Sequence, residues 1–278
     1  MHQFPLILLI FISFLSKAQT RRFVYEYIEV PDSTDIINRK THIMFLDIND
    51  KGSDFFDGEK YQSDSTMISM AKNNQFIMPP REAKFVAYRI TKKYPSYNLT
   101  FIISDYNNRF YVSDTRKQTW VIKKDTDFYK NYRIQKATTR FGGRHWTAWF
   151  TADIPVPDGP YKFHGLPGLI LKLEDTGANH KFNLIGIKNN IKSYDYPITD
   201  MWRKKLNLSL EKYRDIYREY RKDPAKNYRM DVVAGNVYES IGENGEIETP
   251  NQKLRDREVS LKAEISKDNN IIEIDLLK

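Results

Sequence analysis

The sequence predicts a mainly β protein built on one strongly curved antiparallel sheet, half-barrel in form. Short apolar segments follow one another with turn residues between them, at the spacing of β-hairpins. Aromatic residues make up 14% of the 278 residues, including 18 tyrosines, and aromatic side chains favour strands. A meander of about ten strands curls to limit its exposed edges. A closed barrel or a two-sheet β-sandwich is the alternative architecture.

Residues 1–18 have the pattern of an export signal peptide. Phe4–Leu15 is an uninterrupted apolar run that is too short to span a bilayer. Ser16-Lys17-Ala18 then supplies small residues for cleavage before Gln19. We therefore expect a single mature domain of residues 19–278, periplasmic or outer-membrane associated, or secreted. No later segment reads as a transmembrane span, and nucleic acid is not an expected partner outside the cytoplasm.

The β core is expected over about residues 21–190, with turns that favour hairpins. Asp105–Asn108 and Gly142-Gly143 are the clearest hairpin signals. Residues 65–78 allow a helix that Pro79-Pro80 would end. Strands are predicted at 22–31, 41–48, 84–91, 98–104, 109–113, 119–123, 132–141, 144–152, 169–174 and 181–187.

The pattern changes after residue 197. Apolar residues spaced four, three, four and three apart predict one amphipathic helix near 200–222, within a helical segment of about 198–224. They are Leu206, Leu210, Tyr213, Tyr217 and Tyr220. Asp200 is the expected N-cap, and Asp223-Pro224 ends the helix. Residues 230–278 are expected to form strands and loops.

Positive charge is concentrated around this helix. Lys188–Met230 contains twelve Lys and Arg against six Asp and Glu, and so carries +6 of the chain's net +8. An anionic lipid surface or an acidic protein surface would be attracted to such a face. A solvated helix with local ion pairs is the alternative.

The densest group of turn residues lies between Ile154 and Ile170. Two prolines and Asp158-Gly159-Pro160 precede the hexapeptide Gly165-Leu166-Pro167-Gly168-Leu169-Ile170. Glycine permits positive φ, and proline fixes φ and removes a donor. The hexapeptide is therefore expected to form a tight turn that leads into a buried strand.

These residues resemble the GLPGLI family, which takes its name from this hexapeptide. The resemblance is carried by Lys136, Ala137, Gly143, Arg144, Ala148, Trp149, Phe150, Ile154, Pro155, Gly159, Pro160, Tyr161, Lys162, Phe163 and Gly165–Ile170. It implies an exported protein of Bacteroidota-type bacteria and no established biochemical activity. Members often have a cysteine near Gln135; this chain has no cysteine, so no thiol role carries over.

The same region is the candidate binding surface. On a strand, Trp146, Ala148 and Phe150 face one way and His145, Thr147 and Trp149 the other, so that one set is core and the other a candidate aromatic surface. Arg144 either donates to a carboxylate or phosphate or anchors an ion pair. The surface comprises Arg144, Trp146, Trp149, Phe150, Pro155, Gly159, Pro160, Tyr161, Phe163, Gly165, Leu166, Pro167, Gly168, Leu169 and Ile170.

Catalytic and metal-binding motifs are not recognisable. The chain has no nucleophile elbow and no phosphate-binding glycine pattern. Asp153 and Asp158 could flank a substrate as glycosidase carboxylates do, but their proline and glycine neighbours favour turn roles. His145, His164 and His180 lack paired ligand spacing, so no metal or cofactor is expected.

The leading interpretation is a non-catalytic envelope protein. It would bind an apolar, lipid or peptide-like partner, or assist an outer-membrane protein. The alternative is a hydrolase of unrecognised type. The oligomeric state stays open.

Overall fold

The computed structural model describes residues 20–75, 85–192, 195–242 and 245–278. The predicted export signal and the Pro79-Pro80 stop lie outside these residues. Within the described chain, no helix is both long and apolar enough to cross a membrane.

Twelve strands form one large sheet. They are β1 (Thr20–Glu29), β2 (Lys40–Asn49), β3 (Gly52–Asp57), β4 (Arg89–Lys93), β5 (Asn98–Ser104), β6 (Asn108–Asp114), β7 (Val121–Tyr129), β8 (Tyr132–Phe141), β9 (Arg144–Thr151), β10 (Leu169–Asp175), β11 (His180–Ile191) and β12 (Lys204–Ser209). Their order is β12-β6-β5-β4-β3-β2-β1-β11-β10-β9-β8-β7. Thus β1 to β6 form one meander and β7 to β11 another, and antiparallel pairing of β1 with β11 joins them.

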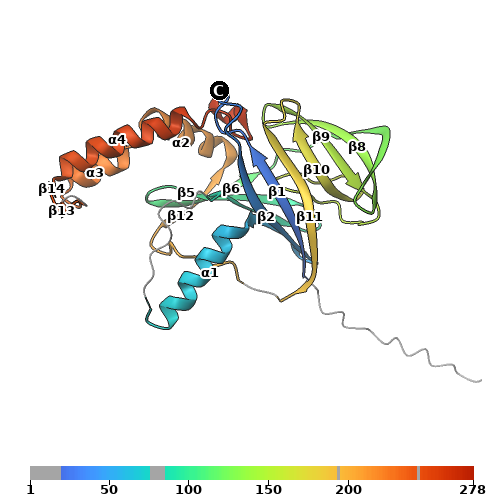
Figure 1. The fold of residues 1–278 in the computed structure, drawn as a ribbon, viewed down its shortest axis with the longest axis horizontal. Helices are drawn as coiled ribbons and strands as arrows, with labels where there is room; N and C mark the ends of the chain where they lie inside the picture. The colour runs from blue at the N-terminus through green and yellow to red at the C-terminus, as the bar shows by residue number, and fades with distance from the viewer. Residues whose placement is uncertain (1–19, 76–84, 193–194, 243–244) are drawn as a thin grey trace, which may run out of the picture.

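The sheet is curved and open. Its end strands, β7 and β12, do not pair with each other. Figure 1 shows β5, β6 and β12 lying across the steep β1 and β2, while β8 to β10 turn away on the other side. The predicted mainly β fold with a curved antiparallel sheet is confirmed, and neither the closed barrel nor the two-sheet sandwich forms. The sheet also contains a parallel pair that was not predicted, because β12 pairs with β6 in parallel.

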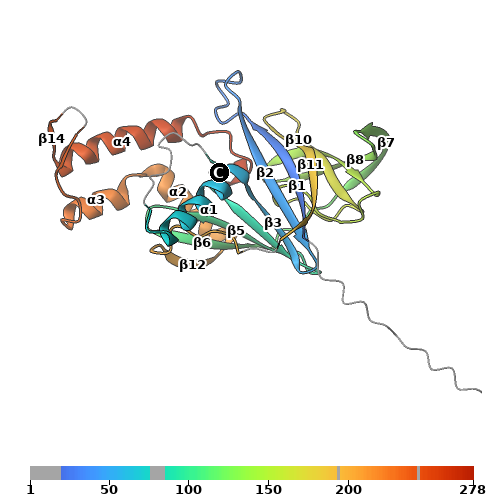
Figure 2. The ribbon, with the colours of Figure 1, turned by 60° about the horizontal axis from the view of Figure 1, so that its bottom comes forward.

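Four α-helices and one 3-10 turn complete the described fold. They are α1 (Gly58–Lys72), α2 (Leu210–Lys222), α3 (Lys226–Val233), α4 (Pro250–Ser266) and η1 (Ile274–Leu277); a small hairpin, β13 (Ser240–Ile241) and β14 (Ile247–Glu248), lies between α3 and α4 in sequence. Figure 2 shows α2, α3 and α4 extending together to one side of the sheet, and we call them the helical arm.

Some predicted elements differ from the structure in their bounds or type. The helix expected near 200–222 begins only at Leu210, because the residues before it pair with β6 as β12. Ser209 instead of Asp200 is its N-cap, accepting a hydrogen bond from the Lys212 N–H. Part of the region expected as strand and loop forms α4, which begins with a Thr249–Gln252 capping box. The strand expected from residue 84 begins at Arg89.

The core lies on one face of the sheet, which we call the inner face. Phe23, Tyr25 and Tyr27 alternate along β1 and are all at most 1% exposed. The loop of residues 154–168 and the C-terminal residues 270–276 contribute side chains to the same apolar cluster. The inner face is therefore covered by irregular chain segments instead of a second sheet.

Candidate functional site

The candidate surface around the hexapeptide is built into the core. Its buried members are Arg144, Trp146, Phe150, Gly159, Pro160, Tyr161, Phe163, Leu166, Gly168, Leu169 and Ile170, its half-buried member is Trp149, and its exposed members are Pro155, Gly165 and Pro167. The predicted alternation along β9 agrees with the structure, and the buried set, which the sequence left open, is Trp146, Ala148 and Phe150. Most of these side chains, however, pack inward and are not available to a partner.

The glycines of the hexapeptide hold a close backbone turn. Gly168 has a φ of +145°, and a Cβ there would lie 1.9 Å from the Thr151 carbonyl oxygen. The next residue, Leu169, donates its N–H to the Ile154 carbonyl at 3.0 Å. Gly165 has a φ of +90° but open space around it. The turn expected from the sequence therefore depends on steric room at Gly168 and on backbone conformation at Gly165.

A buried lysine anchors the loop before the hexapeptide. The Lys92 ammonium group donates to the Asp158 carboxylate, to the Gly159 carbonyl at 2.9 Å and to the Phe163 carbonyl at 3.2 Å. The Asp158 carboxylate also accepts from the Tyr94 hydroxyl. Burial lowers the pKa of Lys92. All three ammonium protons are nevertheless used within the fold, so this pair is a structural anchor.

The two carboxylates considered as a glycosidase pair lie in different surroundings. Asp153 is exposed, whereas Asp158 is fully buried and ion-paired with Lys92. Asp158 has the turn role that its glycine and proline neighbours favour. This arrangement does not support two carboxylates facing one substrate.

Arg144 is an anchor for the C-terminal segment. Its guanidinium donates to the Asp175 carboxylate at 2.9 Å, to the Asn270 side-chain oxygen at 2.6 Å and to the Ile271 carbonyl at 2.7 Å. The structure thus agrees with the interpretation of Arg144 as an ion-pair anchor. Its guanidinium N–H groups donate to groups of the same chain.

Glu273 lies at the centre of a buried ionic cluster. The Lys162 ammonium contacts the Glu273 carboxylate at 2.5 Å and Asp114 at 2.9 Å. Arg116 contacts both acids as well. These neighbours hold the pKa of Asp114 and of Glu273 below the usual range against the opposing effect of burial. The cluster fixes the C-terminal segment to the inner face.

The three histidines do not converge. His145 is exposed, and His164 stacks on Tyr97 with ring centroids 4.8 Å apart. His180 is buried, with Nδ1 2.8 Å from the Tyr27 hydroxyl and Nε2 2.7 Å from the Asn270 carbonyl oxygen. Among the described residues, no three histidines or carboxylates are arranged to hold a metal ion.

A cavity that could admit a partner lies elsewhere, between the helical arm and the end of the β5–β6 hairpin. Its volume is about 350 Å³. We call it the tyrosine groove, because five tyrosines line it: Tyr106, Tyr213, Tyr217, Tyr220 and Tyr228. The remaining lining residues are Ile103, Ser104, Asp105, Phe110, Arg203, Ile216, Pro224, Asn227, Arg257 and Leu261.

Helix α2 supplies one wall of the groove. Tyr213, Ile216, Tyr217 and Tyr220 follow at spacings of three, one and three residues, which places them on one side of a helix. Tyr213 is 4% exposed and packs against Phe110, whereas Tyr220 is 40% exposed at the rim. The predicted amphipathic face is thus both core and groove wall.

The opposite wall comes from residues that the sequence analysis did not select. Tyr106 belongs to the β5–β6 turn and makes an edge-on contact with Tyr228 of α3, with ring centroids 6.2 Å apart. Arg257 and Leu261 come from α4. These residues are more than 100 positions from Tyr106 in sequence, so no local pattern could have joined them.

The hydroxyls of Tyr106 and Tyr220 stay protonated at neutral pH. Burial raises the pKa of Tyr220, and burial with the nearby Asp231 carboxylate raises that of Tyr106. Neutral phenols both donate and accept hydrogen bonds. The groove therefore offers flat apolar rings that carry neutral polar groups.

Comparisons with known proteins identify a fold and no activity. Residues 90–172 match the family described as "Protein of unknown function (Porph_ging)", and this range contains the hexapeptide, so it is compatible with the resemblance seen in the sequence. No curated protein sequence matches the chain.

The similar solved structures include two of PNGF-II. "Structure of PNGF-II in P21 space group" has a TM-score of 0.50 and 19% identity, over 72% of this chain and 33% of that chain. "Structure of PNGF-II in C2 space group" has a TM-score of 0.49 and 18% identity, over 71% and 32%. The chain thus corresponds to about a third of PNGF-II, and at this identity the likeness concerns the fold alone.

Proposed function

We propose that this chain is a non-catalytic envelope protein that binds an extended peptide segment in the tyrosine groove. The observation that carries the proposal is the lining of the groove, in which five tyrosine rings surround about 350 Å³. Ligand pockets commonly span about 300–1,000 Å³. The envelope location rests on the apolar run Phe4–Leu15 and the cleavage pattern that ends at Ala18.

A peptide fits the groove better than an acyl chain does. Aromatic-lined grooves bind proline-containing extended segments, because the flat rings pack on prolines while nearby polar groups bond the peptide main chain. The groove provides such groups in its tyrosine hydroxyls, Ser104 and Asn227. An acyl chain offers no hydrogen-bonding group to these polar side chains.

Selection of random peptides displayed on phage, followed by fluorescence polarisation of enriched sequences, tests the proposal. Asn227 lines the groove and is half-buried, so Asn227→Trp should fill the groove and weaken binding at least about tenfold. Lys226→Trp adds the same side chain at an exposed neighbouring position and should bind as the wild type does. No enriched peptide, or equal binding by the two variants, would overturn the proposal.

A further inference from the structure

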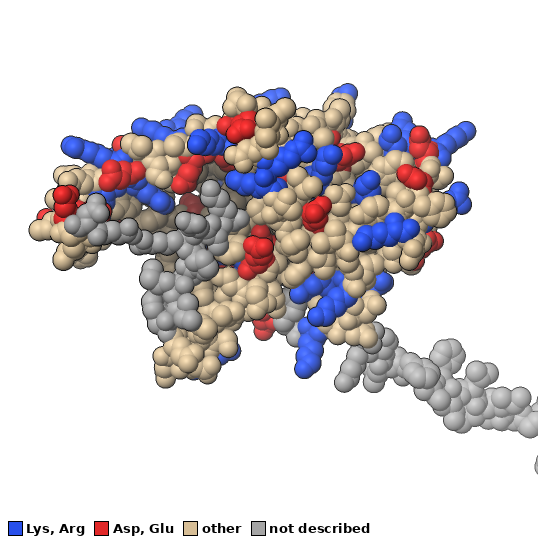
Figure 3. Space-filling model, viewed as in Figure 1, with Lys and Arg blue, Asp and Glu red and all other residues tan. Residues whose placement is uncertain are grey.

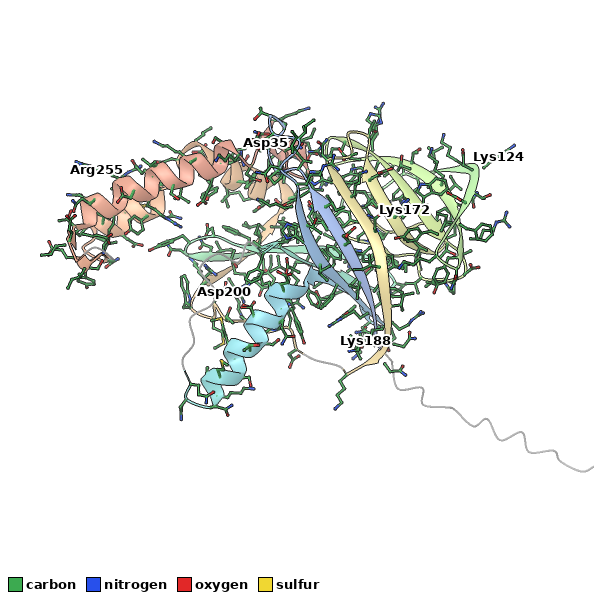
Figure 4. All side chains as sticks on the ribbon, viewed as in Figure 1. Asp35, Lys124, Lys172, Lys188, Asp200 and Arg255 are labelled. Atoms are coloured by element: carbon green, nitrogen blue, oxygen red, sulfur yellow. The ribbon has the colours of Figure 1, made fainter. Side chains whose placement is uncertain are left out.

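A second pocket of about 240 Å³ lies between α1 and the β5–β6 strands. We call it the arginine pocket. Its charged lining residues are Lys60, Asp64, Arg89, Arg109, Asp200 and Arg203. Figure 4 shows Asp200 below β5 and β12 and above α1. The labelled Arg255 lies on α4, far from this pocket in the view.

Two of the four cations in this pocket are neutralised by their own carboxylates. The Lys60 Nζ lies 2.7 Å from an Asp64 oxygen. Arg89 makes a two-pronged interaction with Asp54, at 2.7 and 2.6 Å. The charge available to a ligand therefore depends on Arg109 and Arg203.

Arg109 and Arg203 share one carboxylate. Both guanidinium groups contact Asp200, which also accepts a hydrogen bond from the Ser104 hydroxyl at 3.1 Å. The other acid that acts on Arg203 is Asp105, whose carboxylate accepts the N–H groups of Asn107 at 2.9 Å and Asn108 at 2.6 Å. Asp200 is thus shared between the two guanidinium groups, and Asp105 acts on Arg203 through its charge.

Arg203 also has a donor to spare. Its Nε–H is buried and has no hydrogen-bond partner among the described residues. Burial removes the Arg203 guanidinium partly from water and thereby lowers its pKa. Buried donors normally have a partner, and a guanidinium donates well to a planar carboxylate.

The two pockets meet at the end of the β5–β6 hairpin. Ser104 and Arg203 line both the arginine pocket and the tyrosine groove. A ligand that lies in the groove can therefore place one end beside Arg203. One spare donor suits a carboxylate, which has two oxygens, better than a phosphate, whose oxygens need several donors.

We propose that the arginine pocket binds a carboxylate group of the peptide that occupies the tyrosine groove, with Arg203 as the donor and Arg109 as its supporting charge. This inference rests on the proposed peptide-binding function. It extends that function by naming a carboxylate-bearing peptide as the ligand class.

Acetate is the direct probe, because it does not need the groove. In ¹⁵N NMR spectra at constant ionic strength, acetate should shift the Arg203 Nε–H signal saturably, while chloride should not. Arg203→Lys should weaken acetate binding about tenfold, as expected for loss of one charge-assisted hydrogen bond. Arg255→Lys, an exposed change on α4, is the matched control and should bind normally. A missing shift, or stronger binding of inorganic phosphate than of acetate, would overturn the inference.

Peptides enriched by the phage selection, synthesised with a carboxylate and as the neutral amide, provide the second arm. The wild type should prefer the carboxylate form about tenfold, and Arg203→Lys should lose that preference. Asn227→Trp should lose peptide binding but keep acetate binding, so failure of the groove and failure of the arginine pocket give different results. Equal affinity of the wild type for both peptide forms would refute the carboxylate assignment.

Discussion

Gly168 is the residue at which the hexapeptide has least room. We expect Gly168→Ala to destabilise the protein by at least about 3 kcal/mol, because backbone strain adds to overlap with the Thr151 carbonyl, 1.9 Å from the added Cβ. Gly165→Ala should cost only about 1–2 kcal/mol, because that glycine has positive φ but open surroundings. Urea unfolding of both variants measures the difference. Equal decreases in the free energy of unfolding would mean that the backbone near Thr151 shifts at little cost to accommodate the Cβ at residue 168.

His180 makes stability depend on pH. Burial, with the nearby Arg144 charge, lowers the pKa of His180 to about 4. The neutral ring donates from Nε2 to the Asn270 carbonyl, so Nδ1 accepts from the Tyr27 hydroxyl. Between about pH 6.5 and about pH 4 the unfolded chain takes up a proton that the folded chain does not. Stability should therefore fall by about 3 kcal/mol as the pH falls through this window.

Unfolding free energies measured across that window check the pH effect. His180→Gln should lower stability at neutral pH but reduce the slope, whereas His145→Gln, at an exposed position on β9, should keep the wild-type slope. Asp175, whose pKa is also lowered despite its burial, contributes in the same direction at lower pH. An unchanged slope in His180→Gln would assign the pH dependence to other groups.

The role of a residue could be predicted where it depends only on residues nearby in the sequence. The glycine turn and the inward alternation of Trp146 and Phe150 follow from neighbouring residues. The Lys92–Asp158 anchor joins residues 66 positions apart, and Arg144 reaches Asn270 across 126 positions. Such partners depend on strand order, which the sequence pattern does not specify.

At the scale of elements, the C-terminal segment 270–276 acts as an internal strap. Glu273 is 2% exposed and joins this segment to Lys162 and Arg116. We expect Glu273→Gln to cost about 3–5 kcal/mol, because the buried Lys162 and the half-buried Arg116 lose a charge partner. Glu246→Gln, at an exposed position near β14, should change stability little. Thermal and urea unfolding measure both variants. A Glu273→Gln protein as stable as the wild type would show that Asp114 alone neutralises the cluster.

Element boundaries failed where tertiary pairing decides them. Leu206 and Leu210 have the spacing of a helix, yet residues 204–209 pair in parallel with β6. The helix then starts at Leu210, after Ser209, whose side chain as N-cap accepts a hydrogen bond from the backbone N–H of Lys212. Helix α4 has an N-terminal capping box that the sequence already contains at Thr249 and Gln252. That signal could have identified α4.

Across the whole molecule, part of the basic charge around α2 is paired with nearby acids. Arg221 pairs with Asp268 at 3.2 Å, and Arg229 pairs with Asp223 at 2.9 Å and with Glu258. In Figure 3, blue and red groups alternate along the arm at the upper left. Some of the Lys and Arg in residues 188–230 thus make contacts within the arm and with the C-terminal segment.

The tyrosine groove is a product of the whole fold. Its walls come from the β5–β6 turn, α2, α3 and α4, which meet only because the arm extends beside the open sheet. The sequence predicted the face of α2 but not what would lie opposite it. The motif that dominates the sequence instead contributes buried side chains to the inner face.

The most direct measurement of the central claim is the position of a selected peptide on the protein. With ¹³C-labelled tyrosines, intermolecular nuclear Overhauser effects should connect the bound peptide with the rings of Tyr217, Tyr220 and Tyr228, which line the groove. They should disappear in Asn227→Trp and persist in Lys226→Trp. Contacts of the peptide with Tyr129 on the edge strand β7, and none with the groove rings, would contradict the claim.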